Sequence, residues 1–134
     1  MISRKTDVFV PWHPLPDAKL PMYVDAVLDD NDGFRIIMSD DSGGADAFIV
    51  AFENPLAYRN TNESYLLSLW SSVEKEKLGK IFYMIENSSY LKSFNEMSER
   101  VYADWDIKHF AFYTVEDCID VLSVLPPFFK GINS

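Results

Sequence analysis

Three apolar runs separated by glycine-containing turns, between residues 22 and 53, constrain the fold of this chain more than any other feature of its sequence. Glycine between apolar runs favours a tight hairpin because it tolerates a positive φ. The pattern predicts a three-stranded antiparallel meander. Its strands are MYVDAVLD, FRIIMSD and DAFIVAF, and its turns are Asn31-Asp32-Gly33 and Ser42-Gly43-Gly44.

The length of the first turn decides how the first two strands pair. A two-residue turn places Leu28 opposite Ile37. It also places Arg35 opposite Asp30, where the only base of the segment relieves repulsion between neighbouring carboxylates. A three-residue turn changes this register, and the sequence leaves both open.

The first 21 residues are the least regular part of the chain. Their four prolines exclude a continuous helix or a central strand. We expect residues 1–21 to form an extended lead-in that lies across the domain, with Val8 to Val10 as an edge strand.

Two later segments have the pattern of amphipathic helices. After loop-like residues 54–61, Asn62 suits the N-cap of a helix that ends at Gly79. The second helix covers SSYLKSFNEMSERV and begins at Ser88 or Asn87. Helical spacing places these residues on its buried side: Tyr90, Phe94, Met97 and Val101.

The remaining elements are strands. KIFYMIEN reads as a buried strand, and IKHFAFYT and CIDVLSV form a second hairpin that ends at Pro126 and Pro127. Alternation gives one face of this hairpin to Phe110, Phe112, Ile119 and Val121. We therefore predict one α+β domain over residues 1–134, with an antiparallel or mixed sheet of five to six strands and two helices packed on it.

The net charge of -9 argues against partners that are themselves anionic, such as nucleic acids and acidic membranes. No segment has the length of a membrane span or a signal peptide, and a single cysteine cannot form an internal disulfide, so we expect a cytoplasmic protein. Acidic side chains cluster in the meander, where they would attract a basic surface. The candidate contacts are Asp29, Asp30, Asp32, Asp40, Asp41 and Asp46.

The sequence lacks a recognisable catalytic or metal-binding pattern. Only His13, His109 and Cys118 could supply nitrogen or sulfur ligands, which is too few for a zinc site. We interpret His109 as a half-buried structural histidine, and we place Cys118 opposite Tyr113, away from it. No catalytic residue, metal or cofactor is therefore assigned. A small carboxylate-dependent hydrolase remains an alternative because carboxylates are abundant.

Two aromatic residues outside the core periodicities, Tyr58 and Trp105, are further candidates for partner contact, although packing is the commoner fate of such side chains. We expect a binding protein that is a monomer or a weak homodimer. A regulatory or adaptor domain and a toxin inhibitor both fit this description.

Three segments resemble small acidic immunity proteins that accompany polymorphic and contact-dependent bacterial toxins, over about residues 52 to 127. They are the ENSSYL-like helix start, the strand that holds His109 among aromatics, and the DxIDVLS-like strand from Asp117 to Ser123. The resemblance implies that the chain neutralises a toxin by occluding a basic active-site or substrate-binding surface. The partner would be a basic toxin domain.

Overall fold

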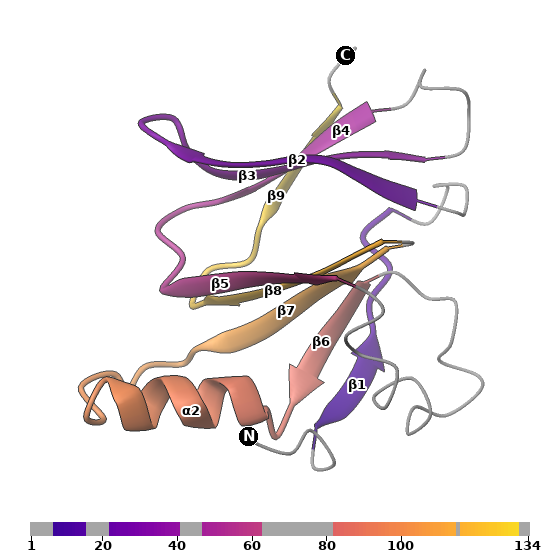
Figure 1. Cartoon of the computed structure of the whole chain (residues 1–134). Helices are drawn as coiled ribbons and strands as arrows, with labels where there is room; N and C mark the ends of the chain where they lie inside the picture. Colours follow the sequence, from indigo (N-terminus) through magenta and orange to yellow (C-terminus); the bar gives the residue numbers. More distant parts are fainter. Residues whose placement is uncertain (1–6, 16–21, 41–46, 63–81, 115, 132–134) are drawn as a thin grey trace.

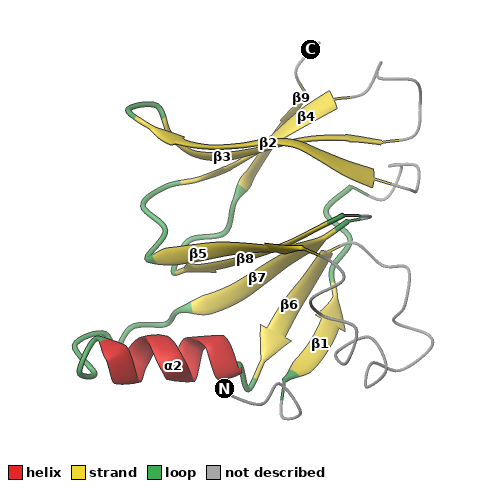
Figure 2. Ribbon diagram, viewed as in Figure 1, coloured by secondary structure: helices red, strands yellow, loops and turns green. Residues whose placement is uncertain are grey.

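The computed structural model describes residues 7–15, 22–40, 47–62, 82–114 and 116–131, which contain nine strands and one helix (Figures 1 and 2). The elements are β1 (Val8–Pro11), β2 (Met22–Asp30), β3 (Gly33–Asp40), β4 (Ala47–Phe52), β5 (Ala57–Asn62), β6 (Phe82–Glu86), α2 (Ser89–Met97), β7 (Lys108–Tyr113), β8 (Asp117–Ser123) and β9 (Phe128–Gly131).

The strands form two antiparallel sheets that pack face to face, with α2 on the outer face of the larger one (Figure 2). The five-stranded sheet has the order β1-β6-β7-β8-β5, and the four-stranded sheet has the order β2-β3-β4-β9. The predicted α+β class agrees with this arrangement in two respects: the strands pair antiparallel, and a helix packs on a sheet. The prediction of one sheet with five to six strands is wrong, because the meander forms a sheet of its own.

Most of the predicted strands are present. The meander is β2, β3 and β4, the N-terminal edge strand is β1, and the second hairpin is β7 and β8. In that hairpin Phe110 pairs with Val121 and Phe112 with Ile119, which confirms their common face.

Two strands are missing from the prediction. β5 replaces most of the expected loop before Asn62, and that residue ends the strand. β9 follows the prolines that were expected to end the last hairpin, and it pairs with β4. Both are edge strands with at least one polar or exposed side, so their pairing depends on neighbours that are distant in sequence. The predicted helix from Asn62 to Gly79 lies outside the described residues.

The core lies between the two sheets and is rich in phenylalanine. The four-stranded sheet contributes alternate residues of β3 and β4, such as Ile36 and Val50, which are fully buried. Trp12, half-buried beyond β1, packs on Phe110 and Phe129 with ring centroids 5.5 and 5.6 Å apart. Trp12 thus contacts both sheets, since Phe110 lies in β7 and Phe129 in β9.

β7 and β8 are buried on both faces, whereas β3 and β4 are buried on one. The second face of β7 and β8 carries a smaller apolar cluster, which includes Phe9, Tyr83 and Cys118. Cys118 pairs with Tyr113, as expected.

Helix α2 begins where the sequence predicts, with Ser88 as its N-cap, but it ends at Met97. Met97 and Val101 are exposed by 84% and 72%, so their placement on the buried side is wrong. The chain leaves the helix through Glu99 and Arg100, whose φ values of 52° and 62° are left-handed. Helical spacing therefore does not extend as far as the apolar pattern implies. No described helix has the length and apolar character needed to cross a membrane.

The β2–β3 hairpin turns within the predicted segment, but its register differs from the one expected for a two-residue turn. Asn31 and Asp32 form the turn, and Gly33 follows with φ of 101°, so Leu28 pairs with Arg35 rather than with Ile37. Arg35 nevertheless reaches Asp30, its diagonal neighbour, with Nη1 2.8 Å from Oδ1. The expected charge pair thus forms in a different register.

Candidate functional site

Five side chains form a hydrogen-bonded network on the outer face of the five-stranded sheet. The carboxylate of Asp120, in β8, is fully buried. Its Oδ1 accepts a hydrogen bond from the Tyr113 hydroxyl at 2.6 Å and lies 2.7 Å from Nε2 of His109. Its Oδ2 accepts a hydrogen bond from Nε of Arg59 at 3.0 Å. Nδ1 of His109 lies 2.7 Å from the hydroxyl oxygen of Ser88. The network joins β5, β7 and β8 to the start of α2.

The partners of its two ring nitrogens indicate where the proton of His109 lies. The Ser88 oxygen accepts the N–H of Leu91 at 3.0 Å, as an N-cap does. The Asp120 carboxylate can only accept, so Nε2 carries the proton that His109 donates to Asp120, and the Ser88 hydroxyl donates its own hydrogen to Nδ1. This assignment matches a donor to an acceptor at both ring nitrogens. His109 is therefore hydrogen-bonded at both ring nitrogens, and it is 1% exposed rather than half-buried.

Arg59 connects the network to solvent. Its guanidinium carbon lies 4.1 Å from the centre of the Tyr90 ring, which in turn lies edge-on to His109 at 5.5 Å. Burial, and secondly the charge of Asp120, raise the pKa of the Tyr90 hydroxyl to about 12. The charge of the buried carboxylate is balanced by the half-exposed guanidinium.

Ser88, His109 and Asp120 have the composition of a nucleophile, base and acid. Ser88 is only 5% exposed, and its oxygen already accepts the Leu91 N–H. Asp7 covers the adjacent helix start by accepting the N–H of Ser89 at 2.7 Å. The Ser88 oxygen is thus shielded in this conformation, and its hydrogen bonds tie the start of α2 to the sheet.

The acidic residues of the meander lie at two ends of a sheet rather than on one patch. Asp29, Asp30 and Asp32 are exposed at the β2–β3 turn, whereas Asp40 is buried at the far end of β3. Asp40 lies seven positions after Gly33, which is roughly 23 Å along a strand. Asp41 and Asp46 lie outside the described residues.

Two of the three exposed carboxylates already have partners. Hydrogen bonds from Arg35, and secondly from the N–H of Asp32, hold the pKa of Asp30 below its usual value. Asp29 accepts a hydrogen bond from the Tyr58 hydroxyl at 3.0 Å, which raises the pKa of Tyr58. Tyr58 also stacks on Phe34 with ring centroids 4.2 Å apart, so it links the two sheets.

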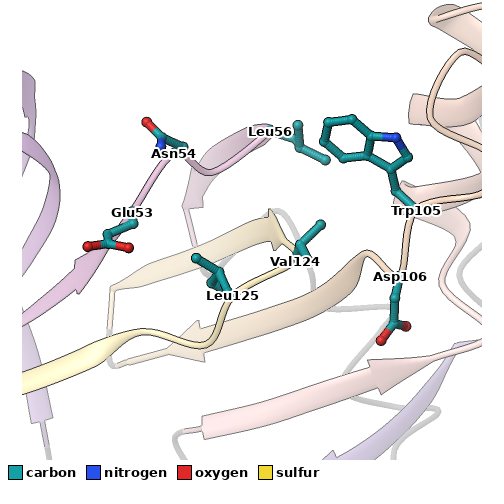
Figure 3. A pocket seen from close by; sticks show the side chains of 7 residues that line it. All are labelled: Glu53, Asn54, Leu56, Trp105, Asp106, Val124 and Leu125. Atoms are coloured by element: carbon teal, nitrogen blue, oxygen red, sulfur yellow. The ribbon is translucent and has the colours of Figure 1, made fainter.

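Trp105, by contrast, lines an open hollow of about 440 Å³ (Figure 3). We call this the Trp105 hollow, and its lining consists of Glu53, Asn54, Leu56, Trp105, Asp106, Val124 and Leu125. Trp105 and Leu125 are exposed by 53% and 50%. An exposed cluster of large apolar side chains in a concavity is typical of a binding site.

The indole of Trp105 is held in place by its neighbours. The ring of Tyr102 meets it edge-on with centroids 4.8 Å apart, and the backbone N–H of Trp105 donates to the backbone carbonyl of Tyr102 at 3.0 Å. Tyr102 packs in turn on Phe94 of α2. On the other side of the hollow, Ser123 fixes the following loop by donating to the carbonyl of Leu125 at 2.8 Å. Both apolar walls are thus built before any partner arrives.

The sequence nominated Trp105 but missed the rest of the hollow. Leu56, Val124 and Leu125 come from segments that read as loop or strand end, and only the tertiary fold brings them together. The sequence signal for these residues was the apolar pair Val124 and Leu125 directly before two prolines. The prolines end the strand, so these two side chains are not covered by strand pairing and can form part of a surface. The sequence analysis also does not predict the buried network, although Ser88, His109 and Asp120 each lie in one of the three segments that carry the family resemblance.

Comparison of the chain with protein-family models, with curated proteins and with solved structures found no match. Among the described residues, no group of three or more His, Cys, Asp or Glu side chains is arranged to hold a metal ion.

Proposed function

We propose that this chain is a binding protein whose contact surface is the Trp105 hollow, and that it neutralises a bacterial toxin by covering a basic active-site or substrate-binding surface. One observation carries the proposal. A half-exposed tryptophan, braced by Tyr102, faces exposed aliphatic side chains in an open concavity. Rigid aromatic anchors of this kind dominate the energetics of many protein interfaces.

The charge of the chain supports a basic partner. Two of the seven lining residues, Glu53 and Asp106, are acidic and none is basic, in a chain with a net charge of -9. A field of one sign accelerates encounter with a partner of the other sign. In this proposal the protein acts in the cytoplasm, as a monomer or weak homodimer, where a toxin would otherwise reach its target.

The proposal is tested by co-expressing the chain with toxin domains encoded beside its gene and measuring growth. The wild-type chain is expected to restore growth, and Trp105→Ala is expected to lose this protection. Met97→Ala is the matched control, because Met97 is exposed by 84% outside the hollow. Equal protection by all three proteins would contradict the role of the hollow.

The exposed acids of the β2–β3 turn have a smaller expected role. We expect Asp29→Asn combined with Asp32→Asn to slow association and to weaken its dependence on salt, because these carboxylates act at a distance. Stopped-flow association rates at low and high ionic strength measure this effect. A change in dissociation rate as large as that of Trp105→Ala would place the contact surface at the turn instead.

An adaptor domain is the alternative within the same class. It would use the same hollow but would bind a partner that is no toxin, so growth in the co-expression experiment would not depend on it. Purification of the complex at low salt, followed by identification of the bound polypeptide, separates the two functions.

A hydrolase is a second candidate because Ser88, His109 and Asp120 are joined by contacts of 2.7 Å. Burial of Ser88 counts against it. A fluorophosphonate probe, which reacts with activated serines, is expected to leave the folded protein unlabelled. Labelling that disappears in Ser88→Ala but persists in Ser93→Ala would support an enzyme instead.

A further inference from the structure

The Trp105 hollow has different chemistry along its length. In Figure 3, Glu53 and Asn54 lie at one end, Trp105 and Asp106 lie at the other, and the side chains of Val124 and Leu125 lie between them. The centre is therefore apolar, and a carboxylate is present at each end.

The two carboxylates are not equivalent. Asp106 forms an ion pair with Lys108, whose Nζ lies 2.9 Å from Oδ2, and in Figure 3 its carboxylate is directed away from the hollow. Glu53 is exposed, and its carboxylate has no hydrogen-bond or ion-pair partner in the described part of the chain. Glu53 is thus the lining carboxylate that can still pair with a cation.

We propose that the hollow receives a partner segment in which a lysine or arginine adjoins an apolar side chain, and that Glu53 selects the basic residue. The apolar side chain would lie on Leu125 and Val124 against the indole of Trp105. The basic side chain would extend its aliphatic stem along the same surface and place its charge at Glu53. This inference rests on the proposed function and specifies the chemistry of the partner.

Charge complementarity identifies this occupant among the alternatives. A second copy of this chain would bring another net charge of -9 to the acidic end of the hollow. A purely apolar segment would leave the Glu53 carboxylate beside a dehydrated surface without a partner, which is unfavourable. A basic segment with an apolar anchor satisfies both ends.

Short peptides test the inference without the natural partner. The probes are the acetylated amides Lys-Leu-Lys, Glu-Leu-Glu and Lys-Ser-Lys, added to the full chain labelled with ¹⁵N at its tryptophans. The indole N–H signal of Trp105 is identified as the one that vanishes in Trp105→Phe. Lys-Leu-Lys is expected to shift this signal with a Kd on the order of millimolar, whereas the other two shift it several-fold less.

Two variants assign the charge selection. Glu53→Gln is expected to weaken Lys-Leu-Lys binding by about three-fold, the size expected of one exposed ion pair. Glu96→Gln, an equal change of net charge at an exposed position of α2, should leave the Kd unchanged within error.

Three results would each overturn the inference: no shift with any peptide, equal binding of Glu-Leu-Glu, or equal effects of Glu53→Gln and Glu96→Gln. The proposed function fails separately, when Trp105→Ala protects cells as well as the wild type. A protein that needs Trp105 for protection but binds the peptides without regard to charge would keep its function and lose this inference.

Discussion

Asp120 and Ser88 show how single residues tie the helix to the sheet. Asp120 is a fully buried carboxylate that accepts hydrogen bonds from three side chains, and the hydroxyl of Ser88 contacts both α2 and His109. Burial of a charge is tolerated only where such partners are supplied. Replacing either residue would therefore break several hydrogen bonds at once.

Replacing Ser88 by alanine tests this role. The change removes the N-cap, which costs about 1 kcal/mol, and leaves Nδ1 of buried His109 without its partner, which costs about 1–2 kcal/mol more. Urea unfolding is expected to show a loss of about 2–3 kcal/mol. Ser93→Ala, within the same helix, is the control and should change stability by less than about 0.5 kcal/mol. Equal losses for the two variants would contradict the network.

The Tyr90 hydroxyl makes stability sensitive to alkali. Its pKa in the folded protein is about 12, above its ordinary value of 10, so the folded state favours the neutral phenol. This contribution is complete below pH 10 and is lost as the pH rises toward 12. At pH 11 the loss amounts to at most about 1.4 kcal/mol, because solvent screens part of the interaction of this partly buried phenol. Tyr90→Phe keeps the ring but has no ionisable hydroxyl. Between pH 8 and pH 11 we expect its unfolding free energy to fall less than that of the wild type, and the difference equals this loss. An unchanged pH dependence would show that Tyr90 ionises equally in both states.

At the scale of elements, strands with strong local signals could be predicted and strands that depend on distant partners could not. β3, β7 and β8 have apolar alternation or dense apolar runs. Such patterns predict a strand whichever residues it pairs with. β5, with the sequence AYRNTN, is polar and forms by pairing with β8, some sixty residues later. The same limit applies to the site, because Trp105 stands out in the sequence while Leu56 and Leu125 become its neighbours only in the fold.

The β2–β3 hairpin shows why register escaped prediction. The Asp-Gly pair indicates a turn that includes Gly33. In the structure the turn residues are Asn31 and Asp32, and Gly33, with φ of 101°, is the first residue of β3. This difference changes every residue pair between the two strands. No atom lies within 4 Å of a Cβ added at Gly33, so a side chain there would meet no steric clash, and only the strain of the positive φ would disfavour it.

Gly33→Ala is therefore expected to destabilise the protein by about 1–2 kcal/mol through backbone strain alone. Asn31→Ala, in the same exposed turn with a negative φ, is the control and should cost less than about 0.5 kcal/mol. Thermal unfolding of both variants measures the difference. If Gly33→Ala is as stable as the wild type, the positive φ at this position is not required.

At the scale of the whole molecule, the Trp105 hollow lies where the segments that follow β4, β8 and α2 approach one another (Figure 3). The helix contributes by bracing the segment that follows it, since Phe94 packs on Tyr102 and Tyr102 on Trp105. The buried network holds the start of the same helix on the sheet. A protein built in this way presents a preformed surface and needs little reordering to bind.

The dissociation constant of the purified chain for the toxin domain proposed as its partner, measured by titration calorimetry, tests the central claim most directly. Truncation of a tryptophan at the centre of an interface costs about 2 kcal/mol or more. Trp105→Ala is therefore expected to raise the Kd by at least about thirty-fold, while Met97→Ala leaves it unchanged. If Trp105→Ala binds the toxin as tightly as the wild type, the Trp105 hollow is not the contact surface and the account is wrong.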